Sequence, residues 1–292
     1  MTKRDITPFI GIAGAVAVAG VIALAGSQGG KAVGGVSAFA LCAVVAFVLQ
    51  WLAFVPAYLL RTDQFFDLTG SLTYVSLDAF ALVAGNREPQ SLVLAALVVV
   101  WAVRLGTFLF MRVVRSGGDR RFDAMKRHLP TFLLTWTLQG LWVFLTAAAA
   151  LAAMTTETPA ALGWAAAAGI AIWVAGFVIE VAADTQKQRF RRDPANRERF
   201  IRSGLWAWSR HPNYFGEIVL WVGVALVAAP SLSGWQWLTM VSPVFVFILI
   251  TRVSGIPLLE RRAKQRWGND LAYQEYLAST PGLILRPPTR GR

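Results

Sequence analysis

Long apolar stretches alternate with short polar stretches along the whole chain. Each apolar stretch has about 17 to 25 residues, the length that an α-helix needs to cross the hydrocarbon core of a bilayer. They run from Phe9 to Ser27, Val36 to Leu60, Leu68 to Gly85, Ser91 to Val114, Thr131 to Met154, Ala161 to Ala183, Pro212 to Ala229 and Trp235 to Leu258. The third and the seventh are the weakest, so seven helices are also possible. The pattern predicts an all-α, polytopic integral membrane protein with about eight transmembrane helices.

The basic residues predict the orientation of these helices. With the N-terminus in the cytoplasm, most basic residues fall on the cytoplasmic side, as the positive-inside rule requires. Of the 28 Lys and Arg residues, only Lys31 and Arg87 fall outside, while Arg104, Arg112 and Arg252 lie within spans. An error of one helix would spread the basic residues over both sides. We therefore predict that both termini are cytoplasmic.

Composition supports a membrane protein with one transmembrane domain over residues 1–292. Hydrophobic residues make up 56% of the chain and charged residues 15%, and the mean hydropathy is +0.53. These values exclude an ordinary soluble globule. The net charge of +12 follows first from topology, and it also suits an anionic cofactor or anionic headgroups. Nucleic-acid binding is not expected, because the basic residues are divided among loops between spans.

Several kinds of site are absent from the sequence. Cys42 is the one cysteine and lies in an apolar span, so no disulfide framework is expected. Two histidines, His128 and His211, are too few for a histidine-rich metal centre. The glycine-rich residues 26–31 lack the ending of a phosphate-binding loop, and no dinucleotide fingerprint follows a strand. We expect no metal site, and any nucleotide must bind without a Rossmann unit.

Polar residues are unevenly distributed along the spans. Residues 1–60 are rich in Ala, Val and Gly and carry little reactive chemistry, so they are predicted to be scaffold helices. Charged residues enter the membrane-proximal segments only after them. Arg104 lies in the middle of a span, where an unpaired cation costs at least ~2.5 kcal/mol. It is therefore expected to face a partner or a watery cavity.

The densest polar chemistry lies immediately before the seventh span. The segment reads Ser209-Arg210-His211-Pro212-Asn213-Tyr214-Phe215-Gly216-Glu217. Proline is favoured in a first helical turn, so a helix is predicted to begin near Pro212. Asn213 and Glu217 then share one helix face, with Arg210 and His211 at its entrance.

Two interpretations of this segment are possible. Arg210 and Tyr214 alone would fit an interfacial anchor and an aromatic belt. That interpretation leaves Glu217 unexplained, because a carboxylate entering the bilayer is costly unless it is paired or used. We therefore interpret the segment as part of a functional site.

Two further basic segments lie on the same predicted side. In the first, Asp184, Lys187 and Arg191 line one helix side, and their spacing alone favours a salt-bridged, solvated face. The second is the tail from Glu260 to Tyr276, which combines Arg and Lys residues with tyrosines. Arg side chains suit phosphates and Tyr rings stack on planar groups, so both segments fit an anionic, planar cofactor. Residues 180–292 are predicted to be the cofactor-binding region.

Three motifs of this region resemble a known family. They are Lys187-x-x-Phe190-Arg191, then Gly204-Leu205-Trp206 followed by residues 209–217, and the tail from Glu260 to Tyr276 ending in Thr280-Pro281-Gly282-Leu283-Ile284. Their order and spacing resemble the C-terminal catalytic region of the steroid 5-alpha-reductase and sterol C14-reductase superfamily, particularly its bacterial branch. The resemblance is thinner at Phe66-Asp67-Leu68, Trp101-x-x-Arg104-Leu105-Gly106 and Gly118-Asp119-Arg120-Arg121-Phe122.

The resemblance implies an NADPH-dependent reductase in the membrane. Hydride would pass to the beta carbon of an alpha,beta-unsaturated ketone, or to a related activated alkene, in a steroid, sterol or other lipid. The residues that the resemblance implies for nucleotide binding are Lys187, Arg191, Arg210, Asn213, Tyr214, Glu217, Arg262, Tyr273 and Tyr276. Arg104 and His211 are added as candidates from their positions.

Hydride addition to an enone leaves negative charge on the carbonyl oxygen, so an acid or hydrogen-bond donor must face it. The candidates are Asp67, Tyr74, Gln139 and Glu217. The Gln-Glu and Tyr constellation that steroid reductases use does not align with this chain. Whether the substrate is a steroid therefore stays open.

Two other functions fit part of the sequence. Membrane methyltransferases of the isoprenylcysteine and phospholipid type share the Arg-His-Pro-x-Tyr signature and bind S-adenosylmethionine, but they are typically shorter. A lipid-binding or transport protein would be expected to show internal repeats with broken helices, and none is seen. The expected partners are a hydrophobic small molecule and the bilayer, without nucleic acid or an obligate protein partner, and with the cofactor site on the cytoplasmic side.

Overall fold

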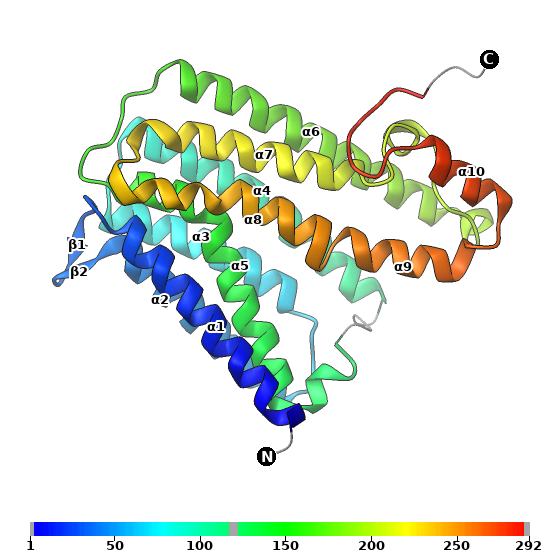
Figure 1. Cartoon of the computed structure of the whole chain (residues 1–292), viewed down its shortest axis with the longest axis horizontal. Coiled ribbons are helices and arrows are strands. Elements are labelled where there is room, and N and C mark those ends of the chain that lie inside the picture. The colour runs from blue at the N-terminus through cyan, green and yellow to red at the C-terminus, as the bar shows by residue number, and fades with distance from the viewer. Residues whose placement is uncertain (1–2, 117–121, 289–292) are drawn as a thin grey trace. The chain divides into compact units, whose positions relative to one another are not determined.

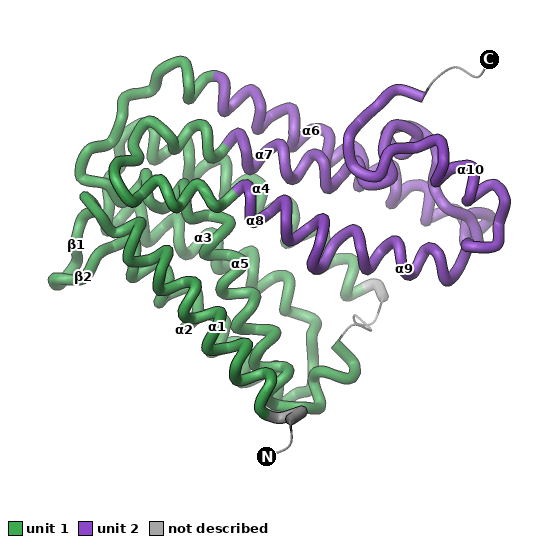
Figure 2. Tube along the Cα trace, in the orientation of Figure 1, with its two compact units in different colours: residues 1–167, 224–242 green, residues 168–223, 243–292 purple. Residues whose placement is uncertain are grey.

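The computed structural model describes residues 3–116 and 122–288, with backbone alone for residues 3–5 and 115–116. The chain forms two compact units, shown in Figure 2. Unit 1 contains Met1–Ala167 and Val224–Ser242, and unit 2 contains Ala168–Gly223 and Pro243–Arg292. The side chains of Lys3 and Arg4, and residues 118–121 of the motif ending at Phe122, lie outside the described parts. The single transmembrane domain stays a prediction.

Most of the described residues are helical (Figure 1). The helices are α1 (Lys3–Gly26), α2 (Ala38–Leu59), α3 (Phe66–Ala84), α4 (Pro89–Ser116), α5 (Leu129–Thr155), α6 (Trp164–Arg192), α7 (Pro212–Ala228), α8 (Val241–Ile248), α9 (Ile256–Trp267) and α10 (Leu271–Ser279). Seven described segments are long and apolar enough to cross a membrane. The predicted class, an all-α multi-pass membrane protein, is confirmed.

Helix α3, the predicted third span, is not among those seven. At its C-terminal end, Lys31 Nζ donates to Gly85 O at 2.9 Å. Lys31 N also donates to Thr155 O at 2.8 Å, so α3 and α5 end together. At its N-terminal end, Asp63 Oδ1 lies 2.7 Å from Lys126 Nζ, just before α5 begins. With 19 residues, α3 is about 28 Å long, close to the hydrocarbon thickness. An eighth crossing at α3 stays a prediction.

Helix α5 is the centre of unit 1. Every residue from Val143 to Thr155 is buried, and α5 packs against α1, α2, α3 and α4. This stretch is rich in alanine, whose small side chain lets neighbouring helices approach closely. The polar atoms at its C-terminal end are bonded, because Asn86 Nδ2 donates to Met154 O at 2.9 Å.

Two details of the fold were not predicted. A short antiparallel hairpin, β1 (Ala32–Val33) and β2 (Val36–Ser37), follows α1. Its turn residues Gly34 and Gly35 have φ of 59° and 82°, as a tight type I′ turn requires. The predicted eighth span from Trp235 to Leu258 falls within one candidate membrane span, Gly234–Trp267, but it is not one regular α-helix. It consists of a 3-10 helix (Gly234–Met240), α8, a π-helical turn (Leu249–Val253) and the start of α9.

In unit 2, α6 and α7 approach until their backbones touch. A Cβ atom added to Gly216 would lie 2.5 Å from Gly176 O and 2.7 Å from Glu180 N. A Cβ on Gly223 would lie 2.6 Å from Gly169 O, so the close contact recurs two turns further along. Only glycine permits this approach. It brings the first turns of α7, which carry the polar motif, directly against α6.

Candidate functional site

The polar motif lies at the start of α7, which begins at Pro212 as predicted. The segment before it pairs with the C-terminal tail. Arg210 N donates to Pro281 O at 2.9 Å, and Ser209 Oγ donates to Leu283 O at 2.8 Å. The tail motif and the motif at α7 are therefore neighbours in unit 2, although many residues separate them along the chain.

Arg210 and His211 share one carboxylate. Arg210 Nη1 lies 2.9 Å from Glu260 Oε1 on α9, and His211 Nε2 lies 3.5 Å from the same oxygen. Arg210 Nε and both ring nitrogens of His211 are buried without a hydrogen-bond partner in the part of the chain that the structure describes. Buried polar atoms are usually bonded, so these atoms have capacity for a ligand.

Burial lowers the pKa of His211 most, and the positive charges of Lys187 and Arg210 lower it further. Together they lower the pKa of His211 from 6.5 to about 3. The Glu260 carboxylate acts in the opposite direction, but 39% of its side chain is exposed, so water screens its charge. The imidazole is therefore neutral at physiological pH and offers one donor and one acceptor.

The neutral state of His211 predicts a pH-dependent stability. The folded chain binds its proton at lower pH than the unfolded chain, so stability is lost as pH falls below about 6.5. At about pH 5 the loss is roughly 2 kcal/mol. We expect the melting temperature of the detergent-solubilised protein to fall between about pH 7.5 and 5, and to fall less in His211→Gln. Equal slopes in both proteins would contradict this result.

The next residues of the motif extend the site along α7. The Tyr214 ring stacks on the His211 ring at a centroid distance of 5.9 Å. Asn213 Oδ1 is buried and has no hydrogen-bond partner among the described residues. Glu217 follows Asn213 by one turn and is half-buried. The spacing that predicted a shared face for Asn213 and Glu217 is thus realised in a regular helix.

Helix α6 supplies the cationic and acidic side of the site. Lys187 Nζ lies 4.4 Å from the centre of the Trp206 ring, a cation–π contact. Glu180 and Asp184 lie two turns and one turn before it and are 2% and 7% exposed. The glycine contact with α7 brings Glu180 against that helix, and neither carboxylate was among the predicted site residues. Arg191, one turn beyond Lys187, is exposed.

Tyr273 and Tyr276 belong to an aromatic cluster that holds α10 in place. The Phe200 ring lies 5.1 Å from Tyr273 and 5.4 Å from Tyr276. Tyr276 Oη donates to Trp206 O at 2.7 Å, and burial raises the pKa of Tyr276 well above its ordinary value. The tyrosines therefore form a fixed aromatic wall, in which Phe200 and Trp206 were not foreseen as members.

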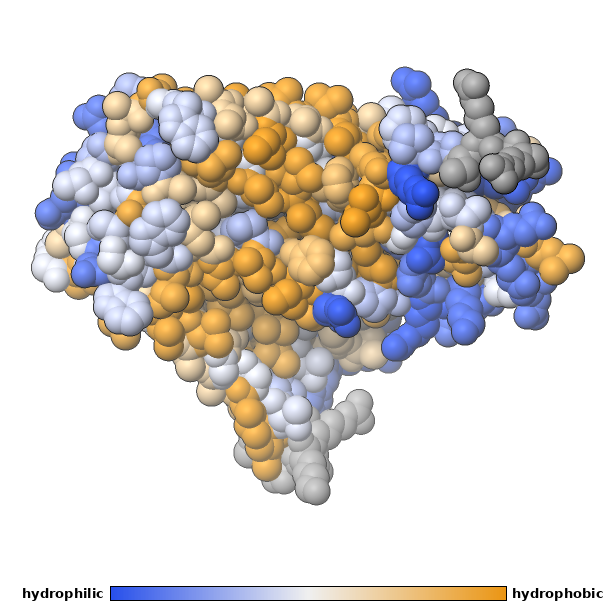
Figure 3. Space-filling model, turned by 45° about the horizontal axis from the view of Figure 1, so that its top comes forward, coloured by the Kyte–Doolittle hydropathy of each residue, from blue (hydrophilic) through white to orange (hydrophobic). Residues whose placement is uncertain are grey.

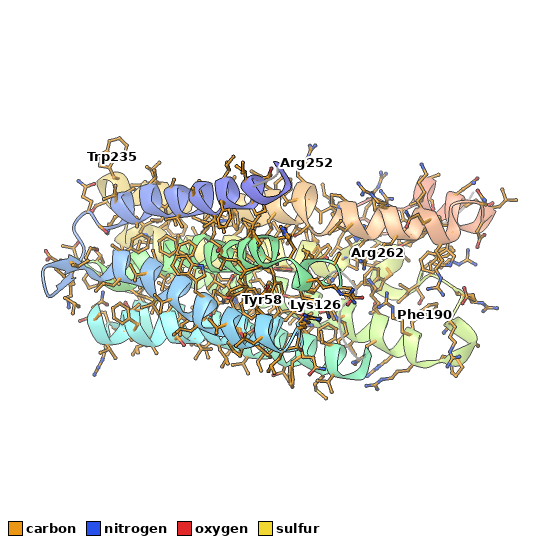
Figure 4. The ribbon with its side chains drawn as sticks, turned by 90° about the horizontal axis from the view of Figure 1, so that it is seen from below. Tyr58, Lys126, Phe190, Trp235, Arg252 and Arg262 are labelled. Carbon is orange, nitrogen blue, oxygen red and sulfur yellow. The ribbon has the colours of Figure 1, made fainter. Side chains whose placement is uncertain are left out.

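The surface of unit 2 is rich in cations. Arg262 is exposed on α9 and is labelled in Figure 4 with Phe190 of α6. At the end of α9, Arg266 Nη2 lies 3.0 Å from Glu198 Oε2, and Trp267 Nε1 donates to Glu198 O at 2.7 Å. Hydrophilic residues gather over α9 and α10 on the face shown in Figure 3. Arg262 thus has room for an anion.

Three of the four candidate acids lie in unit 1, along α3. Asp67 Oδ2 is 3.8 Å from Arg112 Nη2. The buried Tyr74 ring meets Trp101 edge-on at 5.2 Å, and Gln139 Nε2 donates to Phe66 O at 3.1 Å. All three candidates therefore lie against α3. Arg104 lies 5.2 Å from the Phe108 ring on α4.

A buried carboxylate was not foreseen as a candidate. Asp78, one turn after Tyr74, is 1% exposed, and neither carboxylate oxygen has a hydrogen-bond partner among the described residues. Gln50 Oε1 on α2 is also buried without a partner there, while Gln50 Nε2 donates to Thr73 Oγ1 at 2.9 Å. Unit 1 thus keeps several polar groups in its interior.

These observations define the class of the protein. It is a polytopic helical membrane protein with a basic and aromatic site beside its C-terminal tail. The profile of a family described as "Protein of unknown function (DUF1295)" matches residues 53–280. The chain belongs to this family, and the predicted resemblance to the steroid 5-alpha-reductase superfamily is confirmed.

Curated relatives agree with this placement. The chain is 35% identical over 85 residues to 3-oxo-5-alpha-steroid 4-dehydrogenase 1 of Bos taurus, covering 29% of this chain and 31% of the relative. It is 33% identical over 118 residues to the enzyme of the same name from Rattus norvegicus, covering 40% and 39%. An uncharacterised protein of Schizosaccharomyces pombe is 26% identical over 197 residues, or 56% of each chain. The chain thus spans about a third of the length of the mammalian relatives. No solved structure matches it.

Proposed function

We propose that this protein is an NADPH-dependent membrane reductase that adds hydride to an activated carbon–carbon double bond of a steroid, sterol or other lipid. The names of the mammalian relatives support the reaction class. One structural observation carries the proposal. Arg210 Nε, both nitrogens of His211 and Asn213 Oδ1 are buried at adjacent positions without a hydrogen-bond partner among the described residues.

The residues of unit 2 fit a nicotinamide dinucleotide. Arg210, Arg191 and Arg262 offer guanidinium groups, which bind phosphate oxygens in pairs of charge-assisted hydrogen bonds. Asn213 Oδ1 is an acceptor suited to a carboxamide N–H, and Glu217 lies one turn beyond it on the same helix. Tyr214, Tyr273 and Tyr276 offer aromatic rings for the planar groups. The bound cofactor would supply the hydride.

The roles of Arg104 and Lys187 follow from charge. Lys187 is held against Trp206, from where its ammonium group can attract phosphate as a point charge. Arg104 packs on Phe108 in α4 of unit 1. We retain it as a candidate cation for the cofactor, because a guanidinium within a span is costly unless it has a function or a partner.

The substrate oxygen needs a hydrogen-bond donor when the hydride arrives at the beta carbon. Tyr74 suits this role best, because a phenol is protonated at neutral pH and a buried donor acts in a low-dielectric setting. Asp67 Oδ2 lies 3.8 Å from Arg112 Nη2, so this carboxylate already faces a cation. Gln139 has its amide N–H group engaged by Phe66 O. Asp67, Gln139 and Glu217 are the other candidates.

Cofactor selectivity tests the nucleotide assignment. NADPH differs from NADH by a 2′-phosphate, so loss of an Arg that binds this group should weaken NADPH alone. We expect Arg191→Ala or Arg262→Ala to cost about 1.5 to 3 kcal/mol of NADPH binding, which is roughly ten- to a hundredfold in affinity. The dissociation constants of both nucleotides would be measured at fixed salt.

Arg192→Ala is the matched control, because Arg192 is exposed beside Arg191 on a different side of α6. It should leave both affinities unchanged. An equal loss of NADPH and NADH would place the arginine on the shared diphosphate instead. Binding of S-adenosylmethionine without binding of either nucleotide would replace the reductase with a methyltransferase.

A further inference from the structure

Glu260 pairs with two residues of the α7 motif, and one of them, Arg210, is the group best suited to phosphate. Its Oε1 lies 2.9 Å from Arg210 Nη1 and 3.5 Å from His211 Nε2. A phosphate oxygen that bound Arg210 Nη1 would need the same position. Two like charges at that distance repel each other, so both anions cannot occupy it together.

The two partners of this ion pair differ in exposure and in the contacts that hold them. The Arg210 side chain is 22% exposed and that of Glu260 is 39% exposed. Arg210 is also held by its backbone, because its N–H donates to Pro281 O at 2.9 Å. Glu260 makes one contact with the guanidinium rather than a bidentate pair, and exposed pairs of this kind are weak. Of the two residues, Glu260 is the one that can withdraw.

The regular helical backbone is interrupted between α8 and α9. The two helices are separated by the π-helical turn Leu249–Val253, in which Ser254 N donates to Leu249 O at 2.9 Å. Gly255 then precedes α9, and a Cβ atom there would lie 2.7 Å from Ile250 O. Turns of this type are frequent at functional sites. Glu260 lies one helical turn after this break.

We propose that Glu260 is an internal anion that occupies Arg210 in the ligand-free site and is displaced by the phosphate of the incoming nucleotide. This inference rests on the proposed function for the identity of the nucleotide, but the competition itself requires only a phosphate group. Glu260 thereby lowers the affinity of the site and favours release of the spent nucleotide. It acts through Arg210 and is a positioning residue.

The test compares Glu260→Gln with the wild-type full chain in detergent, with inorganic pyrophosphate and NADPH as probes. Glutamine keeps the shape of the side chain without its charge. We expect both probes to bind Glu260→Gln roughly three- to tenfold more tightly. Glu275→Gln is the control, because Glu275 is an exposed carboxylate on α10 without a described ion pair, and it should bind both probes as the wild type does.

The outcomes separate this inference from the proposed function. Equal or weaker binding of pyrophosphate to Glu260→Gln would overturn the inference and make Glu260 a structural support. Tighter pyrophosphate binding with no NADPH binding in any variant would support the inference and refute the nucleotide assignment. Should Glu260→Gln fail to fold, Glu260→Asp retains the charge but withdraws it from Arg210. It should then bind pyrophosphate more tightly than the wild type, and unchanged binding would overturn the inference.

Discussion

Replacing Gly216 with alanine is expected to destabilise the protein and to abolish nucleotide binding together. The added methyl group would lie within 2.5 Å of Gly176 O and 2.7 Å of Glu180 N. Both are backbone atoms of α6, so no side chain can rotate to make room. Overpacking of this kind costs roughly 1 to 3 kcal/mol, and we expect the upper end of that range. Because α7 carries the polar motif, its displacement would move Asn213 and Glu217 out of position.

Gly20→Ala in α1 is the matched control for this substitution. Nothing lies within 4 Å of a Cβ atom built there, and alanine is a better helix former than glycine by roughly 0.5 to 1 kcal/mol. The melting temperature of Gly20→Ala should therefore equal or exceed that of the wild type. A Gly216→Ala protein with unchanged melting temperature and unchanged NADPH affinity would show that α6 and α7 do not approach as closely as described.

Removing Arg210 is expected to have the largest effect on ligand binding alone. Arg210→Ala deletes the guanidinium group at the entrance of the site and leaves Glu260 without its cation. Loss of a hydrogen bond to a charged group costs about 1.5 to 3 kcal/mol, or ten- to a hundredfold in affinity. The uncompensated Glu260 carboxylate would add repulsion toward phosphate. Affinity for NADPH would be measured by calorimetric titration of the detergent-purified protein.

Two further variants make this result specific. Arg210→Lys keeps the charge but loses the planar fork, so its affinity should fall between those of the wild type and Arg210→Ala. Arg202→Ala removes an exposed arginine shortly before the motif and should change nothing. If Arg210→Ala bound NADPH as tightly as the wild type, the phosphate site would lie elsewhere in unit 2.

The helices were predictable because long apolar runs have few alternatives in a bilayer. Pro212 marked the start of α7 correctly, and the spacing of Asn213 and Glu217 placed them on one face. Helix α3 was harder to assign, since its polar residues make it resemble a soluble segment. The residues that flank it, Gly85 and Asp63, are bonded to Lys31 and Lys126.

The site was only partly predictable, because its main contacts join segments far apart along the chain. The resemblance pointed to Arg210 and to the tail, but no local pattern indicates that Glu260 pairs with Arg210 and His211. Tyr273 and Tyr276 were interpreted as stacking partners, whereas the structure also packs them on Phe200. The hairpin had a local signal that was overlooked, since Gly34-Gly35 between valines is typical of a tight turn.

The side of the membrane on which each terminus lies stays a prediction that labelling can test. The connections after α1, α3 and α5 meet at one end of unit 1, where Lys31 contacts Gly85 and Thr155. This end carries few basic residues and is therefore expected to face away from the cytoplasm. Single cysteines near Lys31 and Lys264, in a chain lacking Cys42, should react from opposite sides. Labelling from the same side would refute this topology.

The measurement that tests the central claim most directly is the thermal stability of the detergent-purified chain with NADPH, NADH or S-adenosylmethionine added in turn. A ligand that binds only the folded state stabilises it, by about 2.7 kcal/mol at a concentration one hundred times its dissociation constant. We expect NADPH to raise the melting temperature most, NADH to raise it less, and S-adenosylmethionine to leave it unchanged. A rise with S-adenosylmethionine alone would contradict the reductase proposal.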